Sequence, residues 1–186
     1  FKELQSELGD EIEHYSNLFK SQAEIEQEID YLIVDLAAGL SDVVMTFLCA
    51  CQHRFIVFKD EPSSIADAYA IIKVMIQDYQ LHNISLIPNC VESQEEGERL
   101  YQSINTVINN FLGENVRYLH SIREDEMVLR AIKASKPLLA FAPSSKSTID
   151  YASLAKIVTA MPAKTDISGG LQFFVERFAT SHLSTG

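Results

Sequence analysis

The sequence predicts an α/β protein with a mostly parallel sheet and helices on both of its faces. Apolar runs of strand length alternate with longer segments whose apolar residues recur at helical spacing. The short runs are apolar throughout, as is typical of strands buried on both faces of a parallel sheet. Of the 186 residues, 47% are hydrophobic and 22% are charged, which suits a folded protein with a sizeable core.

Four strands are predicted, and each is followed by polar or small residues. The strands are predicted at residues 30–35, 54–59, 83–88 and 116–122. In a parallel sheet ligands bind beyond the carboxyl ends of the strands, so the residues found there are the first candidates for a site. These candidates are Asp35, Gly39, Glu61, Asn89 and the loop after Ile122.

Helices are predicted between and after these strands. They are predicted at residues 11–28, 42–51, 63–79, 94–112, 125–135 and 146–160, with a last short helix near the end of the chain. Ser64 and Asp67 resemble a capping box, which would tie down two free amide groups at a helix start. Gly113 is a natural helix end.

Composition excludes several classes of function. The formal net charge is −11, from 15 basic and 26 acidic residues, which argues against direct binding of nucleic acid because phosphate contacts need clustered Lys and Arg. No apolar run approaches the length that spans a bilayer. Cys49, Cys51 and Cys90 lack the spacing of metal ligands and are interpreted as reduced, packed thiols.

The strongest local signal for chemistry is the acid that ends the first predicted strand. Asp35 is followed by Ala-Ala and then Gly39 within five residues. A carboxylate there can hold Mg²⁺ beside a phosphate, directly or through water, while the small residues let a ligand approach the backbone. Residue patterns alone leave an alternative open, since Asp35 could cap the next helix and Asn89 could cap the turn after its strand.

Longer motifs resemble the MinD/ParA-type deviant Walker ATPases, a family of P-loop NTPase-like fold, and in particular the FlhG/FleN branch that regulates flagellar number. Residues 31–42 (YLIVDLAAGLSD) resemble the Walker B and switch II segment, and residues 61–74 resemble the signature helix of that branch. Asn89 in Ile-Pro-Asn-Cys-Val matches the family's adenine-binding asparagine. The resemblance covers about residues 25–178 and continues at residues 95–101, 143–146 and 169–178.

The resemblance implies a role for each candidate residue in binding ATP or ADP with Mg²⁺. Asp35 would be the metal-positioning, catalytic acid, and Gly39 would sense the γ-phosphate. Asn89 would hydrogen-bond the adenine, and Glu61 would lie near the ribose or the dimer partner. Arg123 belongs to the segment that walls the base in this family.

The sequence departs from the family in two places. The glycine-rich P-loop and its lysines are absent, so residues 1–161 are expected to be the C-terminal part of a MinD-like nucleotide-binding domain whose N-terminal part lies upstream of Phe1. His120 and Arg123 stand where family members usually have a glycine and a proline. This second departure leaves base affinity open and allows a degenerate nucleotide site.

Residues 162–186 are predicted to be a linker and an amphipathic C-terminal tail. Leu171, Phe174, Val175 and Phe178 fall on one helical face. The resemblance implies that residues 170–178 contact the membrane peripherally, whereas the alternative is that this helix docks on its own domain. Basic residues are sparse there, so attraction to anionic lipid is expected to be small.

Together these features predict a regulatory ATPase switch in the bacterial cytoplasm, with peripheral contact to the inner face of the cell membrane. The resemblance implies an ATP-dependent homodimer, control of the number and placement of polar flagella, and three kinds of partner: a flagellar GTPase, a flagellar transcription regulator and switch-ring proteins. Two alternatives remain open. One is a non-catalytic interaction module of the same fold, and the other is a MinD-type division-site regulator.

Overall fold

The structure, a computed structural model, describes residues 30–162, which belong to two compact units. The described part of the first unit is residues 30–52, and that of the second is residues 53–162. The predicted helix at 11–28 and the predicted tail lie outside the described residues. The predicted domain boundary at residue 161 stays a prediction.

The described part of the first unit contains the helix α2 (Asp42–Ala50), preceded by residues 30–41 without regular secondary structure. The helix begins after Ser41, whose hydroxyl accepts a hydrogen bond from the Val44 amide at 3.3 Å. Its buried Phe47 and Ala50 form a small core with partly buried neighbours. These neighbours are Val34, Leu36, Val43 and Cys51.

The predicted strand at residues 30–35 is wrong. This segment forms no strand, and Tyr31, Leu32 and Ile33 are exposed, Ile33 to 88%. A parallel strand needs a neighbouring strand to pair its amide and carbonyl groups, and the described part of the first unit contains no other strand. An apolar run alone therefore did not decide the secondary structure here.

The second unit is built around a parallel sheet, which confirms the predicted α/β fold. Its long central strand is β2 (Ile84–Val91), and β1 (Arg54–Phe58) pairs with it in parallel. Two short strands, β3 (Arg117–Tyr118) and β4 (Ile122–Arg123), also run parallel to β2. The single strand predicted at 116–122 is thus interrupted in the middle.

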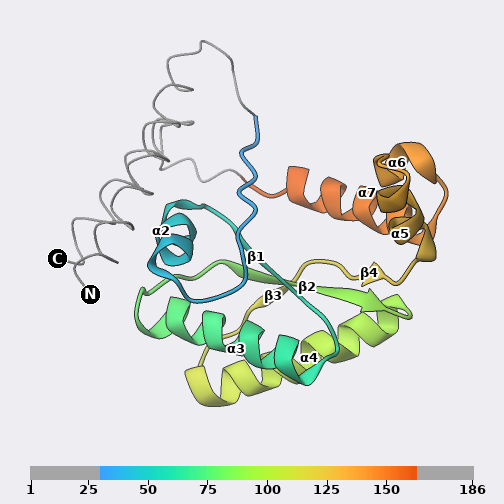
Figure 1. Cartoon of the computed structure of the whole chain (residues 1–186). Coiled ribbons are helices and arrows are strands. Elements are labelled where there is room, and N and C mark those ends of the chain that lie inside the picture. Colours follow the sequence, from blue (N-terminus) through green and yellow to red (C-terminus); the bar gives the residue numbers. More distant parts are fainter. Residues whose placement is uncertain (1–29, 163–186) are drawn as a thin grey trace, which may run out of the picture. The chain divides into compact units, whose positions relative to one another are not determined.

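Helices lie on both faces of this sheet (Figure 1). On one face lie α3 (Pro62–Gln77) and α4 (Gln94–Leu112), and on the other lies α7 (Lys146–Thr159). Two shorter helices, α5 (Glu126–Lys133) and α6 (Leu138–Phe141), connect β4 to α7. This order places α5, α6 and the start of α7 after the carboxyl end of β4.

The helix starts and ends follow from local capping chemistry. α4 spans its predicted bounds, because the Ser93 hydroxyl accepts the Glu96 amide at 3.2 Å and Gly113 ends the helix with φ +70°. The predicted capping box in α3 is wrong, since this helix already begins at Pro62. The Ser64 hydroxyl instead accepts the amide of Lys59 at 3.0 Å.

The main core lies between the sheet and the layer of α3 and α4. Its fully buried large side chains include Phe58, Ile72, Met75, Leu86 and Ile108. On the opposite face Ile87, Leu119 and Ile122 pack against partly buried residues of α7 and the residue that follows it. These are Leu154, Val158 and Met161.

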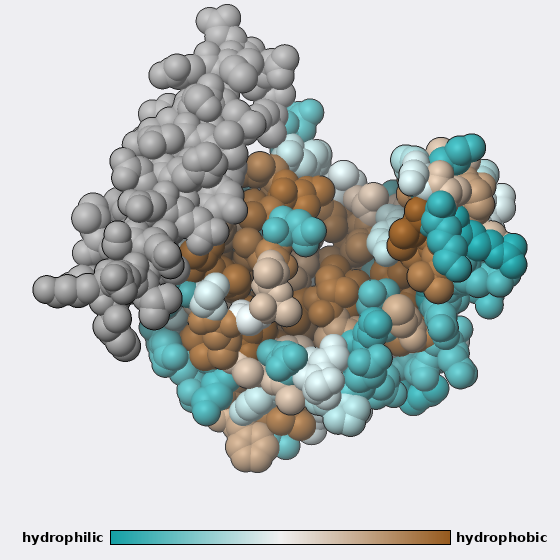
Figure 2. All heavy atoms as spheres, in the orientation of Figure 1, coloured by the Kyte–Doolittle hydropathy of each residue, from teal (hydrophilic) through white to brown (hydrophobic). Residues whose placement is uncertain are grey.

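Within residues 53–162, helices cover β1 on one face only, whereas every strand was predicted to be buried on both faces. Its burial alternates, and Phe55 and Val57 are 37% and 58% exposed. α7 packs over β4 and the end of β2, so it does not cover β1. Figure 2 shows apolar residues on this face of the sheet, between α3 and α7.

No helix within residues 30–162 has the length and apolar character needed to cross a membrane.

Candidate functional site

Asn89 lies in an irregular stretch near the carboxyl end of β2. It pairs with Ile122 of β4, whereas Val91 pairs with Arg123, so the register shifts across Cys90. Cys90 has φ +57°, and its amide donates to Asn89 Oδ1 at 3.0 Å. The Asn89 side-chain nitrogen donates to no group within the described residues. The bulge therefore presents a half-exposed amide with an unused donor.

Arg123 is held by a nearly buried carboxylate on α7. Asp150 is 2% exposed, and its two oxygens accept hydrogen bonds from Arg123 Nε and Nη2, each at 2.9 Å. The Arg123 backbone amide also donates to Asp150 Oδ2 at 2.9 Å. The bidentate geometry fixes both the guanidinium and the strand that carries it.

The protonation states of this pair follow from burial and mutual contact. Burial raises the pKa of Asp150, but hydrogen bonds from the side chain and backbone of Arg123 outweigh it, so the pKa lies below its usual value. The same hydrogen bond raises the pKa of Arg123. The two groups are therefore charged at neutral pH and form an ion pair.

The first residue of α4 joins this network from the other face of the sheet. Gln94 Nε2 donates to the Ser121 carbonyl at 2.9 Å and to Asp150 Oδ1 at 3.2 Å. The Ser121 hydroxyl hydrogen-bonds the Tyr118 hydroxyl at 2.9 Å, and burial raises the pKa of Tyr118. Gly97, one turn along α4, leaves room for Ser121. α4, β4 and α7 thus meet at a single carboxylate.

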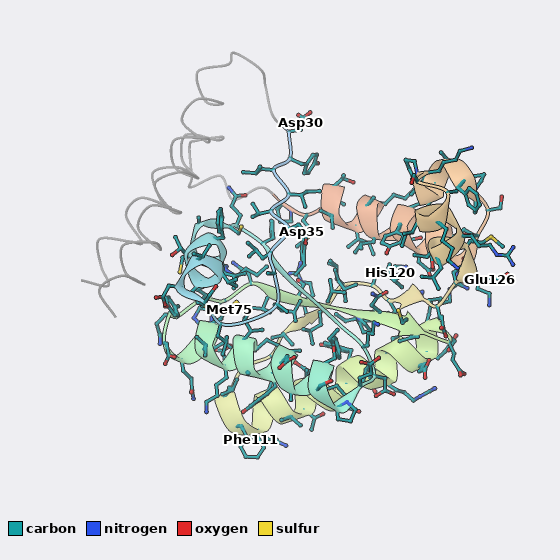
Figure 3. The ribbon with its side chains drawn as sticks, in the orientation of Figure 1. Asp30, Asp35, Met75, Phe111, His120 and Glu126 are labelled. Carbon is teal, nitrogen blue, oxygen red and sulfur yellow. The ribbon has the colours of Figure 1, made fainter. Side chains whose placement is uncertain are left out.

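His120 faces the same carboxylate without bonding it. Its Nε2 lies 3.9 Å from Asp150 Oδ1, is buried, and has no hydrogen-bond partner among the described residues. Figure 3 shows His120 on the segment between β3 and β4, on the side of the sheet where α7 lies. Burial lowers the pKa of His120 despite the nearby Asp150 charge, so the imidazole is neutral at pH 7.

The loop after β4 is tied to the first turn of α7. The Ser147 hydroxyl donates to the carbonyl of Arg123 at 2.8 Å, and the Ser147 amide donates to Asp125 Oδ2 at 3.1 Å. Asp125 Oδ1 accepts the amide of Met127 at 2.9 Å and so caps α5. Hydrogen bonds from Met127 and Ser147 amides hold the pKa of Asp125 below its usual value.

Glu61 and Asn89 lie at the carboxyl ends of two neighbouring parallel strands, Glu61 after β1 and Asn89 among the last residues of β2. Phe58 of β1 is level with Pro88 of β2, and each candidate residue comes one to three positions later. Glu61 is exposed and precedes α3, and its side chain makes no capping hydrogen bond. Glu61 therefore lies beyond the end of β1, as predicted, whereas Asn89 lies inside β2, because this strand continues to Val91 instead of ending at Pro88.

Asp35 and Gly39 belong to the first unit. Asp35 is exposed, and because Ser41 caps α2, Asp35 does not fill the capping role that the residue pattern left open. Gly39 has φ +132°, a conformation that favours glycine. The two units are described separately, so the convergence of Asp35 and Gly39 with Asn89 stays a prediction.

A lone carboxylate suits only one kind of magnesium site. Residues 30–162 contain no group of three or more His, Cys, Asp or Glu side chains that could hold a metal ion. Mg²⁺ bound to a nucleotide takes one or two carboxylates and completes its shell with phosphate oxygens and water. Asp35 therefore fits a nucleotide-bound ion, and the described residues offer no site for a metal held by protein alone.

Sequence reasoning missed three residues of this network: Gln94, Ser121 and Asp150. Gln94 was recognised only as the start of a helix, and Asp150 only as a residue within one. Asp150 lies 27 positions from Arg123, and nothing in the local pattern links the two. The one usable signal was general: a buried carboxylate requires a cationic partner.

Comparison with known proteins gives three relatives, while no family model matches the chain. The antiactivator FleN of Pseudomonas aeruginosa is 33% identical over 172 residues, which is 92% of this chain and 61% of that protein. The flagellum site-determining protein YlxH of Helicobacter pylori is 31% identical over 127 residues, 68% of this chain and 42% of that protein. The septum site-determining protein MinD of Bacillus subtilis is 23% identical over 133 residues, 72% of this chain and 48% of that protein. The chain thus spans less than two thirds of each relative.

Proposed function

We propose that this chain, which belongs to the FlhG/FleN branch of the MinD/ParA-type family, is part of an adenine-nucleotide switch that controls the number and placement of polar flagella. The observation that carries the proposal is the 33% identity to an antiactivator named FleN over 92% of the chain. A second relative is named for determining the flagellar site. The parallel sheet with candidate residues at its carboxyl edge supports nucleotide binding.

Asn89 is the proposed adenine-binding residue. Its side-chain nitrogen is unused within the described residues, and its oxygen accepts only the adjacent Cys90 amide. An Asn side chain matches the donor and acceptor pattern of adenine, and such a contact is worth about 1–3 kcal/mol of discrimination against the wrong base. Titration calorimetry with ADP on the full-length protein tests this, and an Asn89→Ala variant that binds as tightly as the parent would remove Asn89 from the site.

Asp35 is the proposed acid beside the nucleotide-bound Mg²⁺, and Gly39 is the proposed sensor of the γ-phosphate. In this proposal ATP binding favours a homodimer, hydrolysis restores the monomer, and Glu61 lies near the ribose or the partner subunit. The dimer then acts on a flagellar GTPase, a flagellar transcription regulator or switch-ring proteins.

Hydrolysis and dimerisation by the full-length protein test the role of Asp35. We expect Asp35→Ala to abolish Mg²⁺-dependent ATP hydrolysis and the ATP-dependent rise in mass measured by light scattering. Asp30→Ala is the matched control, because Asp30 is a second exposed acid nearby that lies outside the segment 31–42. Equal hydrolysis by the parent and Asp35→Ala would exclude Asp35 from the mechanism.

Flagellar counts test the biological proposal. Cells that carry Asp35→Ala in place of the parent protein are expected to lose control of flagellar number, while Asp30→Ala cells keep it. Electron microscopy of both strains gives the distribution of flagella per cell. Unchanged counts in an Asp35→Ala strain, or a division defect with normal flagella, would instead favour the MinD-type division-site role suggested by the 23% identity to MinD.

One observation favours the non-catalytic interaction module as a second candidate. The Arg123 guanidinium is bonded to Asp150 in the segment that the family resemblance places beside the base. If this arrangement abolishes the nucleotide site, calorimetry of the full-length protein shows no heat of binding with millimolar ATP or ADP. Binding of either nucleotide at micromolar concentrations removes this alternative.

Peripheral membrane contact through residues 170–178 is proposed separately, because these residues lie outside the described structure. Co-sedimentation with vesicles of bacterial lipid composition, with and without ATP, tests it. We expect Phe174→Glu to abolish ATP-dependent sedimentation, since a charge on the apolar face opposes insertion. Sedimentation that is unchanged in Phe174→Glu argues for docking of this helix on its own domain.

A further inference from the structure

We propose that Asp150 is a positioning residue for base recognition: its carboxylate, together with Ser147, holds residues 122–125 against the bulge that carries Asn89. This inference rests on the proposed adenine site. Asp150 and Ser147 lie three residues apart on α7 and therefore face the same way. Neither residue is assigned to nucleotide contact, so their effect is exerted through β4.

The backbone of Arg123 is satisfied by α7 and not by the sheet. The hydrogen bond to Val91 of β2 is made by the next residue, Glu124, whose amide donates to the Val91 carbonyl at 2.8 Å. The Arg123 amide and carbonyl are bonded instead by Asp150 Oδ2, at 2.9 Å, and the Ser147 hydroxyl, at 2.8 Å. One turn of α7 thus provides hydrogen-bond partners for the amide and carbonyl of Arg123. In an inner strand of a sheet, a second neighbouring strand would provide them.

The ion pair makes this attachment stiff. Asp150 is 2% exposed and accepts hydrogen bonds from the Arg123 amide, Nε and Nη2 and from Gln94. A carboxylate this buried is tolerated only while its partners stay in place, because an unpaired buried charge is strongly unfavourable. Displacement of β4 from α7 would break all of these hydrogen bonds at once, so β4 is held in one position.

The position of β4 in turn decides the geometry around Asn89. Only two residue pairs join β4 to β2, Asn89 with Ile122 and Val91 with Arg123, and the bulge at Cys90 lies between them. A shift of β4 would change the bulge and redirect the Asn89 amide. Loss of Asp150 is therefore expected to weaken recognition of the base and to leave contacts to the phosphates unchanged.

The ratio of the dissociation constants for GDP and ADP, measured by calorimetry on the full-length protein, isolates the base. Both ligands carry the same phosphates and ribose, so the ratio reports adenine recognition alone. We expect Asp150→Asn to lower this ratio about tenfold, as loss of one well-formed base contact does, and Ser147→Ala to lower it less. Arg130→Gln is the control, because it removes an exposed pair, Arg130 with Glu126 at 3.1 Å, and should keep the parental ratio.

Asn89→Ala, measured in parallel, separates the two proposals. If Asn89→Ala leaves the ratio unchanged, the adenine site itself is wrong and the role of Asp150 falls with it. If Asn89→Ala lowers the ratio while Asp150→Asn and Ser147→Ala keep it, the adenine site stands and the positioning role of Asp150 is overturned.

Amide hydrogen exchange shows whether the effect is local. In Ser147→Ala we expect faster exchange at residues 122–125 and parental rates in β1, because only one hydroxyl contact to β4 is lost. This variant keeps the ion pair, so it retains a folded protein even if Asp150→Asn does not. Parental exchange rates at residues 122–125 in Ser147→Ala would contradict the inference.

Discussion

A single glycine allows α4 to approach the segment between β3 and β4. A Cβ atom added at Gly97 would lie 1.9 Å from Ser121 Oγ and 2.6 Å from Ser121 Cβ, and Ser121 is fully buried. We expect Gly97→Ala to lower the free energy of unfolding by about 1–3 kcal/mol, since the backbone must shift to relieve the overlap. Urea titration followed by circular dichroism measures this change.

Two further variants identify the cause. In Gly97→Ala with Ser121→Gly the overlap is removed, so the double variant should be at least as stable as Ser121→Gly alone, because alanine is a better helix former than glycine. Gly113→Ala is a control of a different kind, because its Cβ would meet nothing within 4 Å and the cost comes only from φ +70°. Additive losses in the double variant would rule out the steric explanation.

The buried side chain of His120 is expected to make the free energy of unfolding depend on pH near the ordinary pKa of histidine. Burial lowers the pKa of His120 in the folded chain, whereas the unfolded chain takes up a proton near the ordinary pKa of about 6.5. The unfolded state therefore binds more protons below that pH, and stability falls as the pH is lowered through this range. We expect the loss of unfolding free energy between pH 7.5 and pH 5.5 to be smaller in His120→Gln than in the parent.

The matched control is an exposed histidine. His82 lies at the surface, 3.7 Å from Glu114, and His82→Gln measured over the same pH interval shows what the loss of an exposed imidazole does. Carboxylates titrate at lower pH and contribute little in this window. A parental pH dependence in His120→Gln would show that the imidazole is not held neutral by burial.

At the scale of the element, capping chemistry made some helices predictable to the residue. α4 was predicted at 94–112 because Ser93 and Gly113 stand at its ends, and the structure has the same bounds. The strand predicted at 30–35 failed because pairing with another strand, and not apolar composition, makes a strand. Likewise, the interruption between β3 and β4 reflects pairing with a bulged β2, which no local pattern reports.

Asp125 joins two helices and is expected to matter more than an ordinary helix cap. Its carboxylate accepts the Met127 amide of α5 and the Ser147 amide of α7. We expect Asp125→Ala to cost more than the roughly 1 kcal/mol of a single cap, as judged by the midpoint of urea unfolding. Ser93→Ala removes one capping bond of α4 and serves as the comparison. Equal losses for the two variants would mean that the contact to α7 contributes nothing.

For the whole molecule, the edge of the sheet was easier to predict than the residues that support it. Parallel β1 and β2 bring Glu61 and Asn89 to one edge, as the alternation of elements predicted. The network around Asp150 could not be predicted in this way, because its members come from α4, β4 and α7 and meet only after those elements pack. Contacts that depend on packing leave no periodic trace in the sequence.

The overall charge predicts that the chain does not bind nucleic acid directly. With 15 basic and 26 acidic residues, this chain has a formal net charge of −11, which opposes association with a phosphate backbone. We expect fluorescence anisotropy with duplex DNA at physiological salt to give a dissociation constant weaker than about 10⁻⁴ M, the weak end of non-specific binding. Micromolar binding with a steep salt dependence would reveal a basic surface that composition conceals.

The second unit has its own core and is expected to fold independently. In residues 53–162, α3 and α4 cover one face of the sheet with buried Ile72, Met75 and Ile108, and α7 covers Ile87 and Ile122 on the other. A fragment of residues 53–162 should therefore unfold cooperatively, with a urea dependence of about 1–2 kcal/mol per molar, as is usual for a small domain.

The exposed Phe55 and Val57 on β1 make this a demanding test, because uncovered apolar surface favours association. If the fragment showed a broad transition, or bound a hydrophobic dye in the absence of denaturant, β1 would need cover from outside residues 53–162. The variant Val57→Thr, which keeps the β-branched shape of this exposed position, distinguishes simple association of folded fragments from failure to fold, because it should restore a monomer only in the first case.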